Sequence, residues 1–270
     1  MKVAFSLSPG GLLLPYHMGA LASLRYHGRL NGENQVAGSS AGAIATMAHG
    51  CGLDPEKILE ATIAVSDQCP VLGGARGRLL PLLEEQMDNF VGDEEMLHLK
   101  EERDVGIAYT QIFPQKKAFL QTDFDTKEDL LRAVSWSCMF PFFATNWPCL
   151  LDTSQGFPRL MVDGFFSVPR ERFGCPDFQE SADRTIGISV FPKEAIGMDA
   201  FDDNDCISPS ADGMLIEELL RLATQASSRE ELTKVFESGF KDAEEWCFQE
   251  KQREQKQEKE TRESQRKISY

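Results

Sequence analysis

Histidine is scarce in this sequence, and its distribution excludes one common kind of catalytic site. The four histidines are His17, His27, His49 and His98, so the imidazole is absent from residues 99–270. A reaction that depends on a histidine from the C-terminal half of the chain is therefore ruled out. We interpret all four as structural or surface residues, because each lies in or beside a predicted helix.

Basic side chains are also few for a chain of this size. Lys and Arg number 28 against 43 Asp and Glu, which gives a formal net charge of −15 and a pI near 4.8. Nucleic acid is therefore excluded as a partner, because phosphate contacts need clustered Lys and Arg. Overall attraction to anionic membranes is disfavoured for the same reason, so contact with lipid would depend on apolar insertion or on another protein.

Long apolar runs and paired cysteines are missing too. No stretch approaches the roughly 18 apolar residues that a membrane-spanning helix needs, and Lys2 leads directly into a short strand-like run instead of a secretory leader. The seven cysteines are scattered without a C-x-x-C pair, which is typical of reduced thiols. We expect a soluble or peripheral protein of the cytoplasm, with one main domain.

Strands and helices alternate along the first two hundred residues. Patterns of apolar residues predict strands at 3–7, 35–37, 105–113, 117–121, 160–162 and 185–190. They predict helices at 16–24, 43–48, 55–65, 79–87, 126–134, 214–226 and 229–248. This order is typical of an α/β fold with a mainly parallel sheet. We expect the sheet to end before residue 201 and a helical region to follow.

A glycine-flanked serine follows the second predicted strand. Residues 38–42, Gly-Ser-Ser-Ala-Gly, fit the pattern G-x-S-x-G, in which Gly38 and Gly42 permit a sharp strand-to-helix turn that presents Ser40. The positive end of the following helix would favour an alkoxide at that serine. The alternative is a turn of small residues that only packs a helix against the sheet. The strand before and the helix after favour a nucleophile.

Because no histidine is placed to accept the serine proton, a carboxylate at a strand end is the natural substitute. Asp163 is the best candidate, since it follows the apolar run 160–162 and precedes Gly164. We expect a parallel strand to deliver it to the same edge of the sheet as Ser40. The rival Asp-Gly pair begins at Asp212 in a polar loop, where capping of a helix is the expected role.

A glycine pair after the first strand can stabilise negative charge on a reacting oxygen. The backbone N–H groups of Gly10, Gly11 and Leu12 are predicted to point at one oxyanion. A phosphate-binding loop or a plain turn are the alternatives, but no Lys or Arg follows until Arg25.

These segments together resemble the patatin-like phospholipases. The resemblance rests on residues 8–19 (SPGGLLLPYHMG), 38–42 (GSSAG), 133–143 (AVSWSCMFPFF), 163–164 (DG) and 237–243 (ESGFKDA), in family order. It implies a three-layer α/β/α core, a dyad of Ser40 and Asp163, an oxyanion hole at the Gly10-Gly11 loop, and hydrolysis of phospholipid or acylglycerol esters without a metal or cofactor.

Departures from the family pattern fall in the first loop and after Asp163. Pro9 and residues 12–14, all Leu, stand where many members have a third glycine and a basic residue, and Phe165 stands where Gly or Ala is usual. We expect Phe165 to narrow the pocket. Residues 139–143 and Trp147 are expected to wall an acyl tunnel, to form a lip that touches a membrane, or to pack in the core.

We predict three parts: a catalytic core at 1–200, helices packed on it at 201–248, and a charged tail at 249–270 that is a solvated helix or disordered. The favoured function is a serine acyl hydrolase of phospholipid, lysophospholipid or acylglycerol esters, so the expected substrate is a lipid. A peripheral location on membranes or lipid droplets is compatible with this function. The alternatives are a weakly catalytic lipid-binding or regulatory protein and an acyltransferase.

Overall fold

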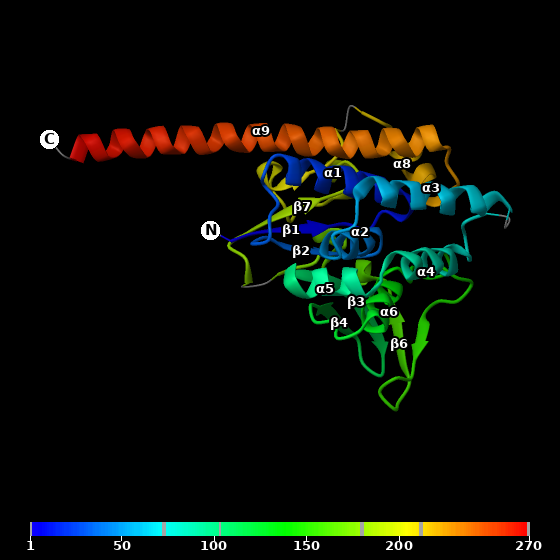
Figure 1. The fold of residues 1–270 in the computed structure, drawn as a ribbon. Coiled ribbons are helices and arrows are strands. Elements are labelled where there is room, and N and C mark those ends of the chain that lie inside the picture. The colour runs from blue at the N-terminus through cyan, green and yellow to red at the C-terminus, as the bar shows by residue number, and fades with distance from the viewer. Residues whose placement is uncertain (1, 72–73, 103, 179–180, 211–212, 269–270) are drawn as a thin grey trace.

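The computed structural model describes residues 2–71, 74–102, 104–178, 181–210 and 213–268. Within these residues one eight-stranded sheet has the order β5-β6-β3-β2-β1-β7-β8, with β4 paired to β3 (Figure 1). Its strands are β1 (Val3–Leu7), β2 (Gln35–Gly38), β3 (Val105–Phe113), β4 (Lys117–Gln121), β5 (Leu150–Asp152), β6 (Arg159–Val162), β7 (Arg184–Ile188) and β8 (Cys206–Ile207).

The α-helices connect these strands and complete the chain. They are α1 (Leu14–Tyr26), α2 (Ala41–Gly50), α3 (Pro55–Val71), α4 (Leu79–Phe90), α5 (Asp93–Glu102), α6 (Lys127–Ser137), α7 (Lys193–Ile196), α8 (Ile216–Thr224) and α9 (Arg229–Ile268). Pro15 lies in the first turn of α1, and the hydroxyl of Thr126 accepts a hydrogen bond from the Asp129 N–H at the start of α6. The expected α/β fold with a mainly parallel sheet is confirmed.

The centre of the sheet is parallel, and this places several strand ends at one edge. β1 pairs in parallel with β2 and β7, with Leu7 opposite Gly38 and Ile188. β2 also pairs in parallel with β3. The loops that follow β1 and β2 therefore leave the sheet side by side, and these loops hold the glycine pair and Ser40.

Strand β6 differs from the prediction in its direction. It pairs with β3 in antiparallel orientation, with Val162 opposite Thr110. The expectation that a parallel strand carries Asp163 is therefore wrong. β3 is long enough to extend beyond the parallel sheet, and β6 runs back along this extension, so that its end reaches the edge where β2 ends. The direction of a strand depends on its connection, which the apolar pattern does not encode.

The two faces of the sheet are covered differently. Phe5 and Leu7 are buried in the largest core cluster, together with residues of α1, α2 and α6. Ala4 on the opposite face packs against Phe178, and the Ser6 hydroxyl donates to the carbonyl of Pro176. The second face is therefore covered in part by residues 176–178, which lie between β6 and β7. The sheet also continues past residue 201, contrary to expectation, because β8 pairs with β7.

Helix α9 lies along α1 on one side of the molecule (Figure 1). Two glycines bring the helices together: a Cβ on Gly239 would clash with the Tyr16 carbonyl, and one on Gly19 would clash with the Phe236 carbonyl. The helix continues without a break past residue 249 and projects beyond the body of the protein (Figure 1). Across the described residues, no helix has both the length and the apolar character needed to cross a membrane.

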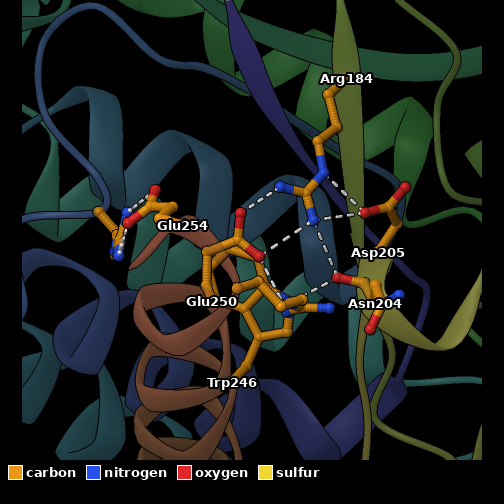
Figure 2. Close-up of polar contacts among 8 residues, drawn as sticks. Arg184, Asn204, Asp205, Trp246, Glu250 and Glu254 are labelled. Carbon is orange, nitrogen blue, oxygen red and sulfur yellow. Dashed lines mark hydrogen bonds and ion pairs between the residues drawn. The ribbon is translucent and has the colours of Figure 1, made fainter. Parts of the chain in front are cut away.

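Polar contacts hold the middle of α9 to the sheet. Figure 2 shows Arg184 of β7 between Asp205 and Glu250, with the Trp246 indole N–H donating to the Asn204 carbonyl at 2.8 Å. One turn later Glu254 accepts two hydrogen bonds of 2.7 Å from Arg29. Contacts with the body therefore extend past residue 248, while the three-part division of the chain stays a prediction.

Candidate active site

Ser40 lies at the sharp turn between β2 and α2. Its backbone has φ 54° and ψ −121°, a strained conformation that side-chain-bearing residues rarely adopt. The turn needs both flanking glycines, because a Cβ on Gly38 would clash with the Gly42 carbonyl, and one on Gly42 would lie 2.6 Å from the Leu7 carbonyl oxygen. This is the geometry of a nucleophile elbow at a helix N-terminus.

The C-terminal end of α6 supports this turn. The N–H of Ser40 donates to the Ser137 hydroxyl at 2.9 Å, and the Cys138 thiol donates to the Ser40 carbonyl at 3.4 Å. The Ser40 main chain is thus fixed from a distant part of the sequence. No role for Ser137 or Cys138 was predicted, although both lie in the uncharged segment 133–143 that contributes to the family resemblance.

Asp163 reaches the same place from the end of β6. Its side chain is fully buried, its N–H donates to the Met139 carbonyl at 3.0 Å, and its Oδ1 accepts a hydrogen bond of 2.8 Å from the Phe165 N–H. Gly164 allows this approach, because a Cβ there would clash with the Ala108 carbonyl and lie 2.5 Å from the Ser39 Cβ. The Asp-Gly pair therefore reflects close packing against the elbow.

The surroundings of Asp163 make it a better base than an ordinary carboxylate. Burial raises its pKa to about 7, against smaller lowering effects of the hydrogen bond from the Phe165 N–H and of the nearby Ser40 hydroxyl. Among the described groups, Oδ2 has no hydrogen-bond partner of ordinary length and angle. The Ser40 contact is therefore looser than a full hydrogen bond, as catalytic contacts in ligand-free sites often are.

The glycine loop lies beside Ser40. Gly11 has φ +55°, and a Cβ on it would clash with the Ala223 carbonyl of α8, so only glycine fits this position. No hydrogen bond to a described acceptor uses the N–H of Gly10, Gly11 or Leu12. The N–H of Ala41, the residue after the elbow serine, is equally uncommitted to described acceptors. The Ala41 N–H was not among the predicted oxyanion donors, although a nucleophile elbow normally uses the N–H of the residue after its serine.

Ser40 opens into a cavity of about 320 Å³ that is almost entirely apolar. The loop residues Gly10, Gly11 and Leu12 line it together with Ser40 and Ala41. The remaining wall consists of Pro9, Leu14, Ile44, Thr62, Leu79, Leu83, Cys138, Phe140, Phe143, Phe165, Phe173, Phe191, Leu220, Ala223 and Thr224. Phe165 therefore contributes to the cavity wall, as expected, and helices α3, α4 and α8 supply parts that the sequence did not reveal.

A second cavity of about 30 Å³ lies between α2, α3 and α4. It shares Leu14, Ile44, Thr62 and Leu83 with the first cavity. These four side chains therefore separate the two spaces. An apolar cavity of this shape suits a hydrocarbon chain whose reactive end lies at Ser40.

Residues 139–143 and Trp147, for which the sequence left a cavity wall, an exposed lip and core packing open, occupy different environments. Phe140 and Phe143 line the cavity, and Met139 is buried in the core. Phe142 and Trp147 are exposed. The segment therefore combines a cavity wall with an exposed surface.

None of the four histidines lines the cavity at Ser40. His17 is fully buried and shares a hydrogen bond of 2.8 Å with the Ser8 carbonyl, and burial lowers its pKa to about 4. His49 contacts Arg25, and burial lowers its pKa to about 3. His27 contacts Glu244, and His98 contacts the Gly50 carbonyl.

The rival Asp212 lies outside the described residues. All seven cysteines are free thiols.

The site combines a strained serine, a buried carboxyl of raised pKa, backbone N–H groups without described acceptors and an apolar cavity. Within the part of the chain that the structure describes, no group of three His, Cys, Asp or Glu side chains could hold a metal ion.

Comparisons with known proteins identify the fold and the family. VipD from Legionella pneumophila has a similar fold, with a TM-score of 0.54 and 10% identity over 92% of this chain and 67% of VipD. Patatin-like phospholipase domain-containing protein 5 from Homo sapiens is 27% identical over 193 residues, which are 69% of this chain and only 41% of the human protein. The family model for patatin-like phospholipases matches residues 5–172, more than half of the chain, which therefore belongs to the patatin-like phospholipase family.

Proposed function

We propose that this protein is a serine acyl hydrolase that cleaves carboxylic esters of lipids, with Ser40 as the nucleophile and Asp163 as its base. The observation that carries the proposal is the interaction of these two side chains: a strained serine in the wall of an apolar cavity and a fully buried carboxyl beside it. A turn that only packs a helix would need neither the strain nor the buried acid.

In the first step, the Ser40 oxygen attacks the ester carbonyl carbon and its proton passes to Asp163. The carbonyl oxygen becomes an oxyanion, for which the N–H groups of Gly10, Gly11, Leu12 and Ala41 are the available donors. Each such donor lowers the barrier by about 3–4 kcal/mol. Collapse of this intermediate breaks the ester bond, Asp163 returns the proton to the departing alcohol, and the acyl group stays on Ser40.

In the second step, a water molecule attacks the acyl-serine carbonyl and gives its proton to Asp163. The second tetrahedral intermediate releases the fatty acid, and the proton returns to the Ser40 oxygen. The pKa of about 7 suits both steps, because a base of that strength can accept a proton near neutral pH and release it again.

An acyltransferase would use the same first step and an alcohol in place of water in the second. The cavity wall is compatible with either acceptor, so hydrolysis and transfer are separated by product analysis with and without added alcohol. A weakly catalytic lipid-binding protein is the other candidate. The buried carboxyl beside Ser40 argues against it, because burial of that charge has a cost that binding alone does not require.

A lipid is the proposed substrate, because the cavity is lined almost wholly by apolar side chains. The seven free thiols support a cytoplasmic location. We further propose that the protein acts peripherally, on membranes or lipid droplets, since its substrates gather at such surfaces.

Labelling with a fluorophosphonate probe tests the proposal directly. The wild-type protein should be labelled at Ser40, and Ser40→Ala should abolish labelling. Ser39→Ala is the matched control, because Ser39 is the neighbouring buried serine and its hydroxyl donates to the Gly174 carbonyl away from the cavity. A folded wild-type protein that stays unlabelled, and that turns over no short-chain ester, would favour the lipid-binding alternative.

A further inference from the structure

An uncharged segment leads from α6 into β5, next to the proposed active site. Residues 133–151 contain no charged side chain, although 26% of the whole chain is charged. Part of this segment is exposed: Trp147 is 71% exposed, Phe142 54% and Phe140 41%. Large aromatic side chains are normally buried, so a group of exposed ones marks a contact surface.

Exposed rings lie both at the cavity and on the loop that follows Phe140. Phe140 lines the cavity and stacks on the exposed Phe166, with ring centroids 5.7 Å apart. The Phe142 N–H donates to the Trp147 carbonyl at 3.2 Å, which holds the loop between them closed. We call Phe140, Phe142, Trp147 and Phe166 the aromatic rim.

Positive side chains adjoin the aromatic rim in an otherwise acidic chain. The Arg76 guanidinium donates to the Phe142 carbonyl at 3.3 Å. Lys116 and Arg170 line a further cavity of about 650 Å³ together with Phe166. Glu171, which follows Arg170, is the acidic neighbour in sequence. Exposed aromatic rings fit the apolar interior of a membrane, and the neighbouring cations fit negatively charged head groups. The combination therefore matches a membrane that contains anionic lipids.

We infer that the aromatic rim is the surface through which this protein binds a phospholipid membrane containing anionic lipids. The inference rests on the proposed function, because it gives a lipid ester a path to Ser40. Phe140 belongs both to the rim and to the cavity wall, so an acyl chain that leaves the membrane at the rim enters the cavity without exposing its methylene groups to water. Tryptophan is suited to the boundary between lipid and water, and phenylalanine to the apolar side of that boundary.

Tryptophan fluorescence provides a direct measurement. Of the three tryptophans, Trp136 and Trp246 are 7% and 6% exposed, so a change of environment on membrane binding reports Trp147. The 270-residue chain with Ser40→Ala would be mixed with vesicles of phosphatidylcholine, alone or with about one third phosphatidylserine. The emission should shift to shorter wavelength, and more strongly with the anionic vesicles.

Variants then locate the surface by vesicle co-sedimentation. Phe142→Ser and Trp147→Ser should each lower the partition coefficient by about tenfold, and Lys116→Gln with Arg170→Gln should remove the preference for anionic vesicles. Leu97→Ser is the matched control, because Leu97 is 60% exposed on α5 and belongs to no part of the rim. It should bind like the parent protein.

Two results would overturn the inference. One is unchanged vesicle binding in the Phe142 and Trp147 variants. The other is a fluorescence shift that grows with protein concentration without vesicles, which would mean that a second copy of the chain covers the rim. The same substitutions are also made in protein that keeps Ser40, and its hydrolysis of a soluble short-chain ester is measured. This assay separates the inference from the proposed function. Vesicle binding that does not depend on the rim, together with intact hydrolysis, refutes the rim alone, whereas rim-dependent binding without any hydrolysis refutes the hydrolase.

Discussion

Replacing Asp163 with Asn should have two effects of opposite sign, on stability and on rate. The folded protein binds a proton at Asp163 with a pKa of about 7, whereas an unperturbed aspartate has 3.8. Between these values the folded state keeps a proton that the unfolded chain has released, so stability falls as pH rises through this window. A difference of about three pKa units corresponds to about 4 kcal/mol lost above pH 7. Asn carries no charge and avoids this loss.

The rate should change in the opposite direction. Only ionised Asp163 can accept the Ser40 proton, so wild-type kcat/KM should rise about tenfold between pH 6 and pH 8 for a pKa of about 7. A carboxyl of ordinary pKa would be ionised at both values and would give a flat profile. Asn accepts no proton, so the variant should lose about 10²–10⁴ of the rate.

The assays are initial rates with a soluble short-chain ester across this pH range and thermal unfolding followed by circular dichroism at pH 5 and pH 8. Asp163→Asn should melt roughly 8–16 °C above wild type at pH 8, since about 1 kcal/mol moves the midpoint by 2–4 °C in domains of comparable size. At pH 5, between the two pKa values, the difference should be less than half as large. Asp152→Asn is the control. Burial there is outweighed by hydrogen bonds from Ser154 and Arg159 that lower the pKa, so that variant should lose stability at pH 8. Near-normal turnover by Asp163→Asn, or equal stability of variant and wild type at pH 8, would refute the reasoning.

Three further substitutions test other parts of the structure. Gly11→Ala should reduce kcat by about a hundredfold with little change in overall circular dichroism, because the added Cβ collides with the Ala223 carbonyl and displaces the loop; unchanged kcat would exclude the loop from the oxyanion site. Leu83→Ala should join the two apolar cavities and move the preferred ester from shorter toward longer acyl chains, as measured across a series from butyrate to palmitate, and an unchanged preference would contradict the wall assignment. Ending the chain after Glu254 should leave the melting temperature unchanged. Ending it after residue 249 removes Glu250 from Arg184 and Glu254 from Arg29 and should cost about 1–2 kcal/mol; equal melting temperatures would show that these contacts add nothing.

Local signals in the sequence were sufficient for most elements and for the residues placed together at the site. Val3–Leu7 is a strand with the predicted bounds, because its apolar run ends at a glycine loop. Gly38, Gly42 and Gly164 each reflect a backbone approach too close for a Cβ, and such glycines mark a site even when the partner is unknown.

Features that depend on contacts between distant segments were not predictable in this way. The apolar pattern of 160–162 is the same for a parallel and an antiparallel strand, so the predicted direction of β6 was wrong. β8 has only two residues, Cys206 and Ile207, too few for any periodicity. The part of the cavity wall supplied by α8 depends on how α8 packs against Gly11, which no segment encodes alone.

The long strand β3 has a consequence for folding kinetics. It pairs with β2, which leads to Ser40, and with β6, which leads to Asp163, so the two side chains meet only when segments far apart in the chain have joined the same strand. Such non-local pairings form slowly, whereas a helix such as α9 forms from neighbouring residues. During refolding the far-ultraviolet helical signal should therefore recover first, and esterase activity should return only with the assembled sheet.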